Sequence, residues 1–165
     1  MRVLAVFDDR NYESHWKKYE RNAVRAVIVG NGTIALVKSK KEGYYKFPGG
    51  GIEANETHMQ ALCRETLEEA GLRIKVDTIR EMGMIREIRK SILAENEIFE
   101  QTSYYYFADV EDSITAVSLD EYEADLGFTL EWIDIRTAYE TDVALGNRQN
   151  TKFILREAFV LGMLL

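Results

Sequence analysis

The chain has 165 residues, of which 46% are apolar, and it carries a formal net charge of −7 at pH 7. This length predicts a single domain over residues 1–165 with a hydrophobic core of its own. The negative charge disfavours a general nucleic-acid surface, because binding a polyanion requires a basic footprint. No apolar run is long enough to cross a membrane, and the short run at residues 3–7 ends in two aspartates, unlike a signal sequence. Cys63 is the only cysteine, so no internal disulfide can form, and we expect a cytoplasmic protein.

The first part of the chain contains three predicted strands. Residues 2–7 are rich in Val and Leu and predict a short strand. Residues 13–21 have no clear period, and their Lys and Arg side chains are interpreted as the solvated part of a loop, with phosphate contact as the alternative. Residues 23–29 and 33–37 flank Gly30-Asn31-Gly32, which is the pattern of a β-hairpin.

A glycine run follows the only proline of the chain, Pro48, and consists of Gly49, Gly50 and Gly51. Proline restricts the residue before it to an extended conformation, so the backbone enters the glycines at a fixed angle. The glycines expose amides and carbonyls that a metal ion or a phosphate can approach closely, although most glycine runs are only turns.

Upstream of the glycine run, Tyr44, Tyr45 and Phe47 are aromatic candidates for stacking on a nucleobase, and Tyr45 is the one assigned to the substrate site. In an extended segment Tyr45 and Phe47 share one face and Tyr44 points to the other, so not all three can reach the site. Core packing is an equally good interpretation of these side chains.

Residues 58–70 predict an amphipathic helix. Thr57 with Gln60 three residues later is a capping-box pattern, and Gly71 stands where a left-handed helix stop is expected. Apolar residues recur at three- and four-residue spacing and define a stripe that faces a core. Three carboxylates fall away from the centre of that stripe: Glu65, Glu68 and Glu69.

The rest of the chain alternates strands with helices. Further strands are predicted from alternation or from β-branched and aromatic content at residues 72–79, 83–92, 102–110 and 128–135. Residues 112–126 are acidic and are interpreted as a loop, residues 136–145 predict a short helix, and Asn150 or Thr151 caps a last helix. This order predicts an α+β fold, a layered α/β/α sandwich. Its mixed β-sheet is covered by the carboxylate helix on one face and by the C-terminal helix on the other.

Glu65, Glu68 and Glu69 are neighbours on the predicted helix surface, and each like-charge pair there costs about 0.2 to 0.5 kcal/mol. Arg64 can pair with one of these carboxylates but cannot neutralise three. A hard divalent cation, Mg²⁺ or Mn²⁺, suits a set of carboxylate oxygens better than zinc, which prefers His or Cys. The alternative interpretation is a solvated acidic helix face, because most charge runs are only surface.

The stretch from residue 50 to residue 72 resembles the Nudix box, the signature of hydrolases that cleave nucleoside diphosphates linked to another group. The matching positions are Gly50, Glu56, Arg64, Glu65, Glu68, Glu69, Gly71 and Leu72. Thr66 departs from the pattern, since the family usually has an aliphatic residue there, but its branched methyl group can still pack against a core. The order of the remaining elements is similar to the family more loosely. The resemblance implies a Nudix-like sandwich.

The resemblance also implies roles for the box residues in hydrolysing a pyrophosphate bond with a divalent metal ion. Glu68 and Glu69 are then the principal metal ligands, Glu65 is a ligand or the general base, and Arg64 orients the carboxylates. Gly50 is expected to add a backbone carbonyl to the metal, and the glycine run is expected to contact substrate. In this family a carboxylate outside the box often joins the metal site, and the candidates are Glu100 and Glu97, with Glu121 and Glu123 behind them.

The intact set of box carboxylates favours an enzyme over a non-catalytic nucleotide-sensing module, because a pure binder does not need the groups that activate water. Two substrate markers of the family are missing. No proline follows Pro48, unlike the pattern of ADP-ribose hydrolases, and residues 86–90 lack the tyrosine usual in diadenosine polyphosphate hydrolases. By elimination the predicted substrate is a (deoxy)nucleoside triphosphate, with neither a nucleic-acid polymer nor a membrane as partner. The sequence leaves a monomer and a homodimer open.

Overall fold

The structure, a computed structural model, describes residues 1–165 and contains ten strands and four α-helices. The strands are β1 (Val3–Asp8), β2 (Lys17–Val27), β3 (Val29–Gly30), β4 (Thr33–Ser39), β5 (Tyr45–Lys46), β6 (Leu72–Ile74), β7 (Arg80–Lys90), β8 (Glu97–Phe107), β9 (Val110–Ile114) and β10 (Phe128–Asp134). The helices are α1 (His58–Ala70), α2 (Glu121–Leu126), α3 (Ile135–Gln149) and α4 (Lys152–Met163), with a short 3₁₀ helix at Val76–Thr78. None of the helices combines the length and the apolar character that a membrane crossing requires.

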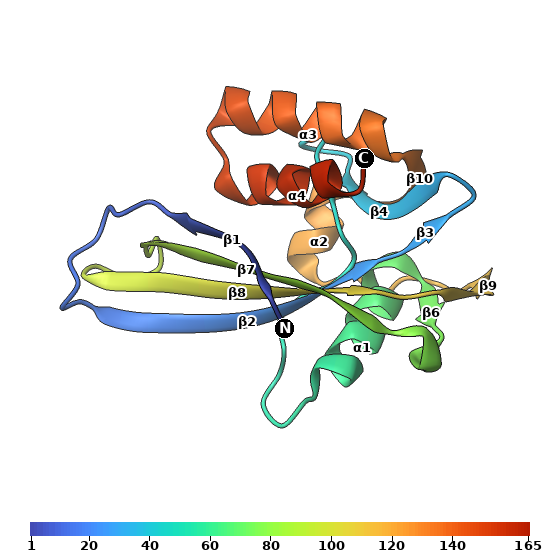
Figure 1. Cartoon of the computed structure of the whole chain (residues 1–165), viewed down its shortest axis with the longest axis horizontal. Helices are drawn as coiled ribbons and strands as arrows, with labels where there is room; N and C mark the ends of the chain where they lie inside the picture. The colour runs from blue at the N-terminus through green and yellow to red at the C-terminus, as the bar shows by residue number, and fades with distance from the viewer.

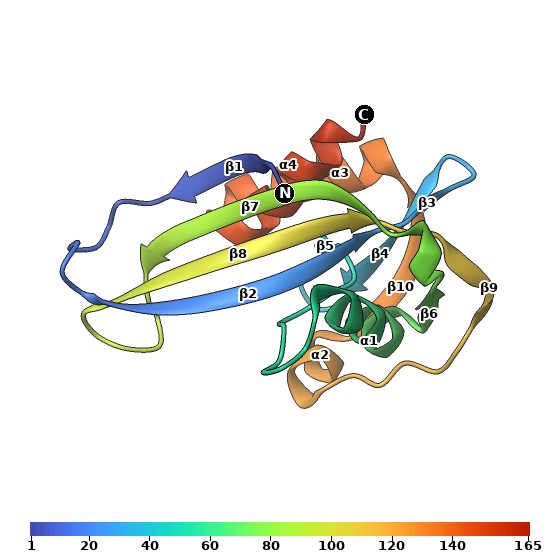
Figure 2. The same ribbon diagram turned by 60° about the horizontal axis from the view of Figure 1, so that its bottom comes forward.

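The strands form three sheets. The largest has the order β1-β7-β8-β2, in which β7 and β8 are antiparallel and the two outer strands run parallel to their neighbours (Figure 2). A second sheet has the order β10-β4-β3, with β5 paired to β4, and β6 pairs with β9 in the third. The predicted mixed sheet is therefore present, but the strands are divided over more than one sheet.

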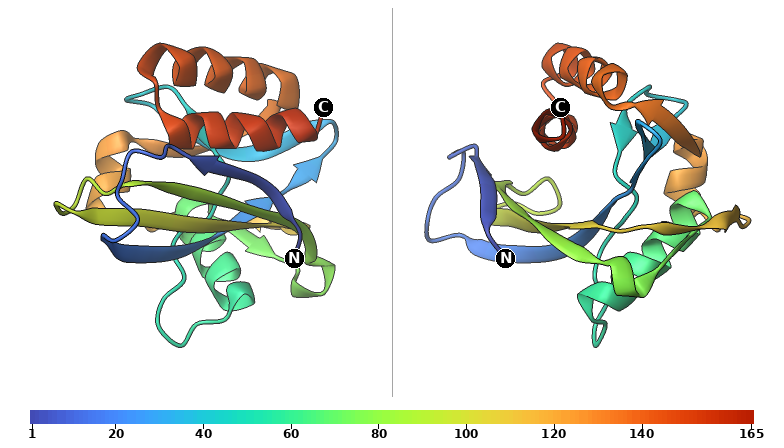
Figure 3. Two further views of the ribbon diagram at one scale, coloured as in Figure 1. Left: turned by 60° about the vertical axis from the view of Figure 1, so that its left-hand side comes forward. Right: turned by 45° about the vertical axis from the view of Figure 1, so that its right-hand side comes forward.

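The sheets separate two helical layers, with α1 on one side and α3 and α4 on the other (Figure 1). Figure 3 shows the same arrangement from two further directions. Each side has its own apolar cluster: Tyr106 packs with Leu62 of α1, whereas its neighbour Tyr105 packs with Leu161 of α4. Adjacent residues of a strand point to opposite faces, so one strand serves both cores. The predicted α+β sandwich, covered by the box helix and the C-terminal helix, is confirmed.

Several predicted boundaries were wrong. The segment interpreted as a loop at residues 13–21 contributes the first half of β2, which begins at Lys17. The acidic segment at residues 112–126 contains the end of β9 and the helix α2, which starts with a capping box formed by Asp120 and Glu123. The helix predicted at residues 136–145 extends to Gln149 and ends at Asn150 in the left-handed conformation. Thr151, one of the two predicted caps, does stand at the N-cap position of α4.

The box helix α1 is fixed at both ends, and its bounds agree with the prediction. Its capping box is complete: the Thr57 hydroxyl accepts from the Gln60 amide, and the Gln60 side chain accepts from the Thr57 amide at 2.9 Å. Gly71 ends the helix with φ 67°, and a Cβ there would lie 2.2 Å from the Thr115 carbonyl oxygen. Glycine is needed at this stop for conformation and for space. The carboxylates of α1 therefore project from a helix that is fixed at both ends.

Candidate active site

The glycine run lies directly against the box helix. The backbone of Gly50 is held by β2, because the Val24 amide donates to the Gly50 carbonyl at 2.9 Å. A Cβ at Gly50 would lie 2.3 Å from the Glu65 carboxylate, and a Cβ at Gly49 would lie 2.1 Å from the Val24 carbonyl oxygen. Only bare backbone fits between β2 and α1 at these two positions. The loop and the carboxylates thus form one continuous wall.

Arg64 joins three carboxylates, more than the sequence predicts for it. Its Nε and Nη2 each donate to Glu56 at 2.8 Å, and its Nη1 donates to Glu65 at 2.8 Å and to Glu68 at 3.2 Å. Nη2 also donates to the Gly51 carbonyl at 3.1 Å. The Arg64 guanidinium lowers the pKa of the Glu56 carboxyl to about 2. Arg64 therefore positions both the box carboxylates and the glycine run.

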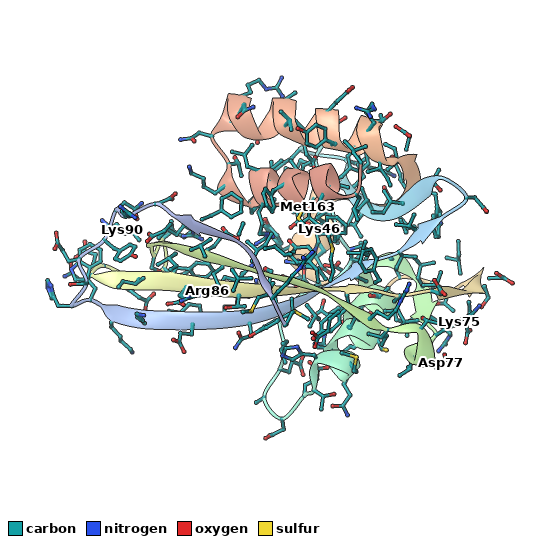
Figure 4. The ribbon with its side chains drawn as sticks, in the orientation of Figure 1. Lys46, Lys75, Asp77, Arg86, Lys90 and Met163 are labelled. Carbon is teal, nitrogen blue, oxygen red and sulfur yellow. The ribbon has the colours of Figure 1, made fainter.

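Glu69 is the most deeply buried of the three box carboxylates, with only 2% of its side chain exposed. The Gly49 amide donates to its Oε2 at 2.9 Å, and Lys46 of β5, labelled in Figure 4, forms an ion pair with its Oε1. The sequence pattern does not point to Lys46. Its signal is weak, because one lysine in a two-residue strand carries no periodicity. The expected repulsion between box carboxylates is thus already offset by two cations, Lys46 and Arg64.

Glu65 and Glu68 differ in exposure. The side chain of Glu65 is 13% exposed, and burial raises its pKa while the Arg64 guanidinium opposes that rise. The side chain of Glu68 is 41% exposed. Glu68 is therefore the box carboxylate that reaches furthest into solvent, and Glu65 is the one that lies under the glycine run.

These groups border a cavity of about 530 Å³. One part of its wall contains the box carboxylates and the glycines, and another contains basic side chains of the main sheet. Aromatic rings complete the wall: Tyr44, Phe99, Tyr122, Phe128 and Phe153. The cavity offers carboxylate oxygens, guanidinium groups and apolar faces together, a combination that suits a phosphorylated ligand with an aromatic base.

The prediction that Tyr45 contacts the substrate needs correction. Tyr45 points away from the cavity, with its hydroxyl donating to Glu131 at 3.0 Å and its amide donating to Asp142 at 2.9 Å. Its neighbour Tyr44 lines the cavity and meets the Phe153 ring edge to face, with the ring centroids 5.0 Å apart. Adjacent residues of an extended segment face opposite ways, so only one of the two tyrosines can line the cavity.

The prediction that Glu100 joins the metal site also needs correction. Its neighbours on β8, Phe99 and Gln101, line the cavity, and strand alternation turns Glu100 to the opposite face of the sheet. There it forms ion pairs with Lys18 and with Arg86, which is labelled in Figure 4. Two cations already neutralise this carboxylate.

Among the weaker candidates, Glu97 and Glu121 do not border the cavity, whereas Glu123 of α2 does. Burial and the nearby carboxylate of Glu69 together raise the pKa of the Glu123 carboxyl to about 7. Of the four predicted candidates outside the box, only Glu123 therefore borders the cavity.

The predicted metal ligands can be tested against the arrangement of donors. No group of three or more His, Cys, Asp and Glu side chains is gathered closely enough to hold a metal ion. Arg64 and Lys46 instead form ion pairs with the box carboxylates. The donor chemistry nevertheless fits a hard divalent cation, because Glu65 and Glu68 both reach one guanidinium nitrogen and all the predicted donors are oxygens.

The NUDIX domain family matches residues 19–153, which is most of the chain. The chain therefore belongs to the Nudix family, and its domain is that of a Nudix-type enzyme. It is similar to the nucleoside triphosphatase NudI of Enterobacter sp. (strain 638), with 26% identity over 128 residues that cover 72% of this chain and 91% of the relative.

It is also similar to the RNA pyrophosphohydrolase of Baumannia cicadellinicola subsp. Homalodisca coagulata, with 41% identity over 51 residues. That match covers 30% of this chain, and the chain spans about a third of the relative's length. Among solved structures, the MutT protein of Bacillus halodurans has 21% identity and a TM-score of 0.58 over 73% of this chain and 72% of its own. At this identity the likeness shows the fold.

Proposed function

We propose that the protein hydrolyses a phosphoanhydride bond of a (deoxy)nucleoside triphosphate with the help of Mg²⁺ or Mn²⁺. The observation that carries this proposal is the contact between Glu65 and the glycine run, with Glu68 and Glu69 beside it at the border of a cavity. Carboxylates fixed next to bare backbone suit a site at which a cation and a phosphate meet.

The residue roles follow from exposure and charge. Glu68 is the most exposed of the three and would hold the metal ion together with Glu65 and the Gly50 carbonyl, with Glu69 completing the set when Lys46 releases it. Bound there, the cation supplies Lewis-acid chemistry for the phosphate and lowers the pKa of water. Burial raises the pKa of Glu65, which suits a group that accepts a proton from water. Arg64 would keep Glu65 and Glu68 oriented.

A nucleoside triphosphate is the proposed substrate because of the relative NudI, which is named a nucleoside triphosphatase. The match to this chain covers 91% of that relative's length. Tyr122 is exposed and Phe153 is half-buried at the cavity wall, and a base can stack on such rings at about 1 to 3 kcal/mol per base. An RNA end is a weaker proposal, since the relatives named RNA pyrophosphohydrolases match only about 30% of this chain. The net charge of −7 also opposes a long polyanion.

A second candidate is a nucleotide-sensing module without catalysis. It is favoured by the ion pairs of Lys46 and Arg64, which neutralise the carboxylates without a metal ion. A site that is stable in this arrangement can bind a nucleotide through its other walls and leave it intact.

The experiment combines a hydrolysis assay with a binding assay on one panel of nucleoside mono-, di- and triphosphates. Each nucleotide is tested with Mg²⁺, with Mn²⁺ and with chelator. An enzyme releases phosphate or pyrophosphate from triphosphates only when a cation is present. Tight binding of a triphosphate without any release under either cation supports the sensing module and contradicts the proposed hydrolysis.

A further inference from the structure

Three arginines of the main sheet line the cavity on the face that α4 covers. Arg21 and Arg25 lie four residues apart on β2 and so share one face of the strand, and Arg89 lies on β7. Strand register brings them together, because Arg21 pairs with Gln101 of β8 and Arg89 pairs with Phe99, two residues away on that strand. Side chains two residues apart share one face. The sheet therefore presents a basic surface to the cavity in a protein whose net charge is −7.

None of these three guanidinium groups has a carboxylate partner within 4.0 Å, whereas the nearby acid Glu87 is paired with Arg156. Arg21 donates to Gln101 at 2.6 Å, and Arg89 stacks on the Phe99 ring at 4.3 Å. These partners orient the two guanidinium groups without neutralising them. The positive charge is left available for a ligand.

Arg25 gives the sharpest indication of a missing ligand. Only 7% of this residue is exposed, its Nη1 donates to the Gly49 carbonyl, and its buried Nε has no hydrogen-bond partner. A charged donor buried without a partner is costly, so native proteins rarely keep one unless something binds there. Arg25 also lines the cavity, so its positive charge lies where it attracts an anion bound there.

The glycine run connects this basic surface to the box carboxylates. A Cβ at Gly51 would lie 3.4 Å from Arg21 Nη2, while a Cβ at Gly50 would lie 2.3 Å from the Glu65 carboxylate. Two consecutive residues thus touch the two halves of the cavity. Because successive Cα atoms are only about 3.8 Å apart, the arginine-lined and carboxylate-lined parts of the cavity wall adjoin each other at the glycine run.

We propose that Arg21, Arg25 and Arg89 form a phosphate-binding subsite, separate from the box carboxylates, that holds the part of the substrate's phosphate chain remote from the bond that is hydrolysed. The inference rests on the proposed function for its substrate class. It adds that the protein selects the length of the phosphate chain: a triphosphate reaches both the carboxylates and the arginines, and a diphosphate reaches only one of them. Arginine suits this task because its planar fork matches phosphate oxygens.

The test is binding of inorganic tripolyphosphate to the metal-free protein, measured by titration calorimetry in chelator. Without a cation the box carboxylates repel the anion, so binding reports on the basic side chains of the cavity, and the variants separate Arg21 and Arg89 from Lys46, Arg64 and Arg156. We expect the parent to bind and the Arg21→Gln/Arg89→Gln double variant to bind at least about tenfold more weakly, because hydrogen bonds between charged groups are lost. Lys90→Gln removes one positive charge next to Arg89 but outside the cavity, and it should change the affinity less than about twofold.

A second variant, Arg25→Lys, keeps the charge and removes the Nε donor, and it should weaken tripolyphosphate binding severalfold while the melting temperature stays near that of the parent. The subsite is ruled out if the parent does not bind tripolyphosphate in chelator, or if the double variant binds it as tightly as Lys90→Gln. The proposed function fails separately, when no nucleotide is hydrolysed with Mg²⁺ or Mn²⁺ although metal-free binding still depends on the arginines. If the arginine subsite and the proposed hydrolysis are both correct, the diphosphate has a higher KM than the triphosphate in the parent. The ratio of the diphosphate KM to the triphosphate KM should then be about tenfold smaller in the Arg21→Gln/Arg89→Gln variant.

Discussion

At the scale of single residues, Gly50 is the glycine whose missing side chain leaves room for a box carboxylate. Its φ is not positive, so glycine is required there for space and not for conformation. In a Gly50→Ala variant the new methyl group would meet the Glu65 carboxylate at 2.3 Å, and the flexible side chain of Glu65 must move away. The fold should survive, but a misplaced carboxylate should lower kcat by about 10- to 100-fold.

Steady-state hydrolysis of a nucleoside triphosphate measures this effect. Gly30→Ala is the matched control, because its Cβ would meet only the Trp132 ring, at an ordinary 3.7 Å. The account of the Glu65 contact is wrong if Gly50→Ala retains the kcat of the Gly30→Ala control.

Residue identities in the box were predictable because the chemistry depends on spacing along one helix, and the structure puts Glu65, Glu68 and Glu69 together at the border of the cavity. Their catalytic roles stay predictions. Glu100 and Tyr45 were misplaced for one common reason. Each is one residue away from a cavity-lining neighbour, and sequence alone does not tell which face of a strand meets the active site.

At the scale of elements, β2 shows what local pattern cannot supply. Its first half is polar, so the sequence resembles a loop there, yet residues 17–27 pair with β8 over their whole length. Tertiary pairing overrides weak local preference. Had the strand been extended back from Ala23, the alternation of Arg21 and Arg25 would have pointed to a basic face.

The strand β5 is supported from α3 by Asp142, which has no exposed surface. One carboxyl oxygen accepts from the Tyr45 amide at 2.9 Å, and the other has no partner. Burial raises the pKa of the Asp142 carboxyl to about 8, because the charged form loses its hydration. The folded protein therefore keeps this proton up to about pH 8, whereas the unfolded chain releases it near pH 4.

Between these two values the unfolded state binds fewer protons, so the free energy of unfolding should fall as pH rises and then level off above pH 8. The Asp142→Asn variant keeps the acceptor for the Tyr45 amide and has no proton to lose. It should be more stable than the parent at pH 7, by an amount on the order of 4 kcal/mol at most, and similar to it at pH 4. Thermal unfolding followed at both pH values measures the difference. An equal change at pH 4 and at pH 7 would contradict the titration of Asp142.

For the whole molecule, binding of the divalent cation should stabilise the native state. A ligand that binds only the native state adds about 2.7 kcal/mol at a hundredfold excess over its Kd. This corresponds to a rise in melting temperature on the order of 5 to 10 °C for a domain of this size. Calorimetry with Mg²⁺ and with chelator measures the rise, and the Glu65→Gln/Glu68→Gln double variant should lack it. The proposed metal site is contradicted if neither Mg²⁺ nor Mn²⁺ raises the melting temperature of the parent above its value in chelator.

The structure changes one expectation about this metal-free state. Repulsion among the box carboxylates is largely offset by Arg64 and Lys46, so the chelated parent is not expected to be strained. Glu69→Gln is for the same reason a poor probe of catalysis, since it would leave Lys46 without its buried partner. Glu68 is the better position for a catalytic variant, because its side chain is 41% exposed and its ion pair is with Arg64.

The turnover of Glu68→Gln on a nucleoside triphosphate with Mg²⁺ tests the central claim most directly. Glu140→Gln, on the exposed side of α3, is the control with the same chemical change. If the box carboxylates take part in catalysis, kcat should fall by at least about 100-fold in Glu68→Gln. The melting temperature of this variant should stay within about 2 °C of the parent. The control should keep its activity. A Glu68→Gln protein that turns over the triphosphate at nearly the parental rate would contradict the assignment of this site.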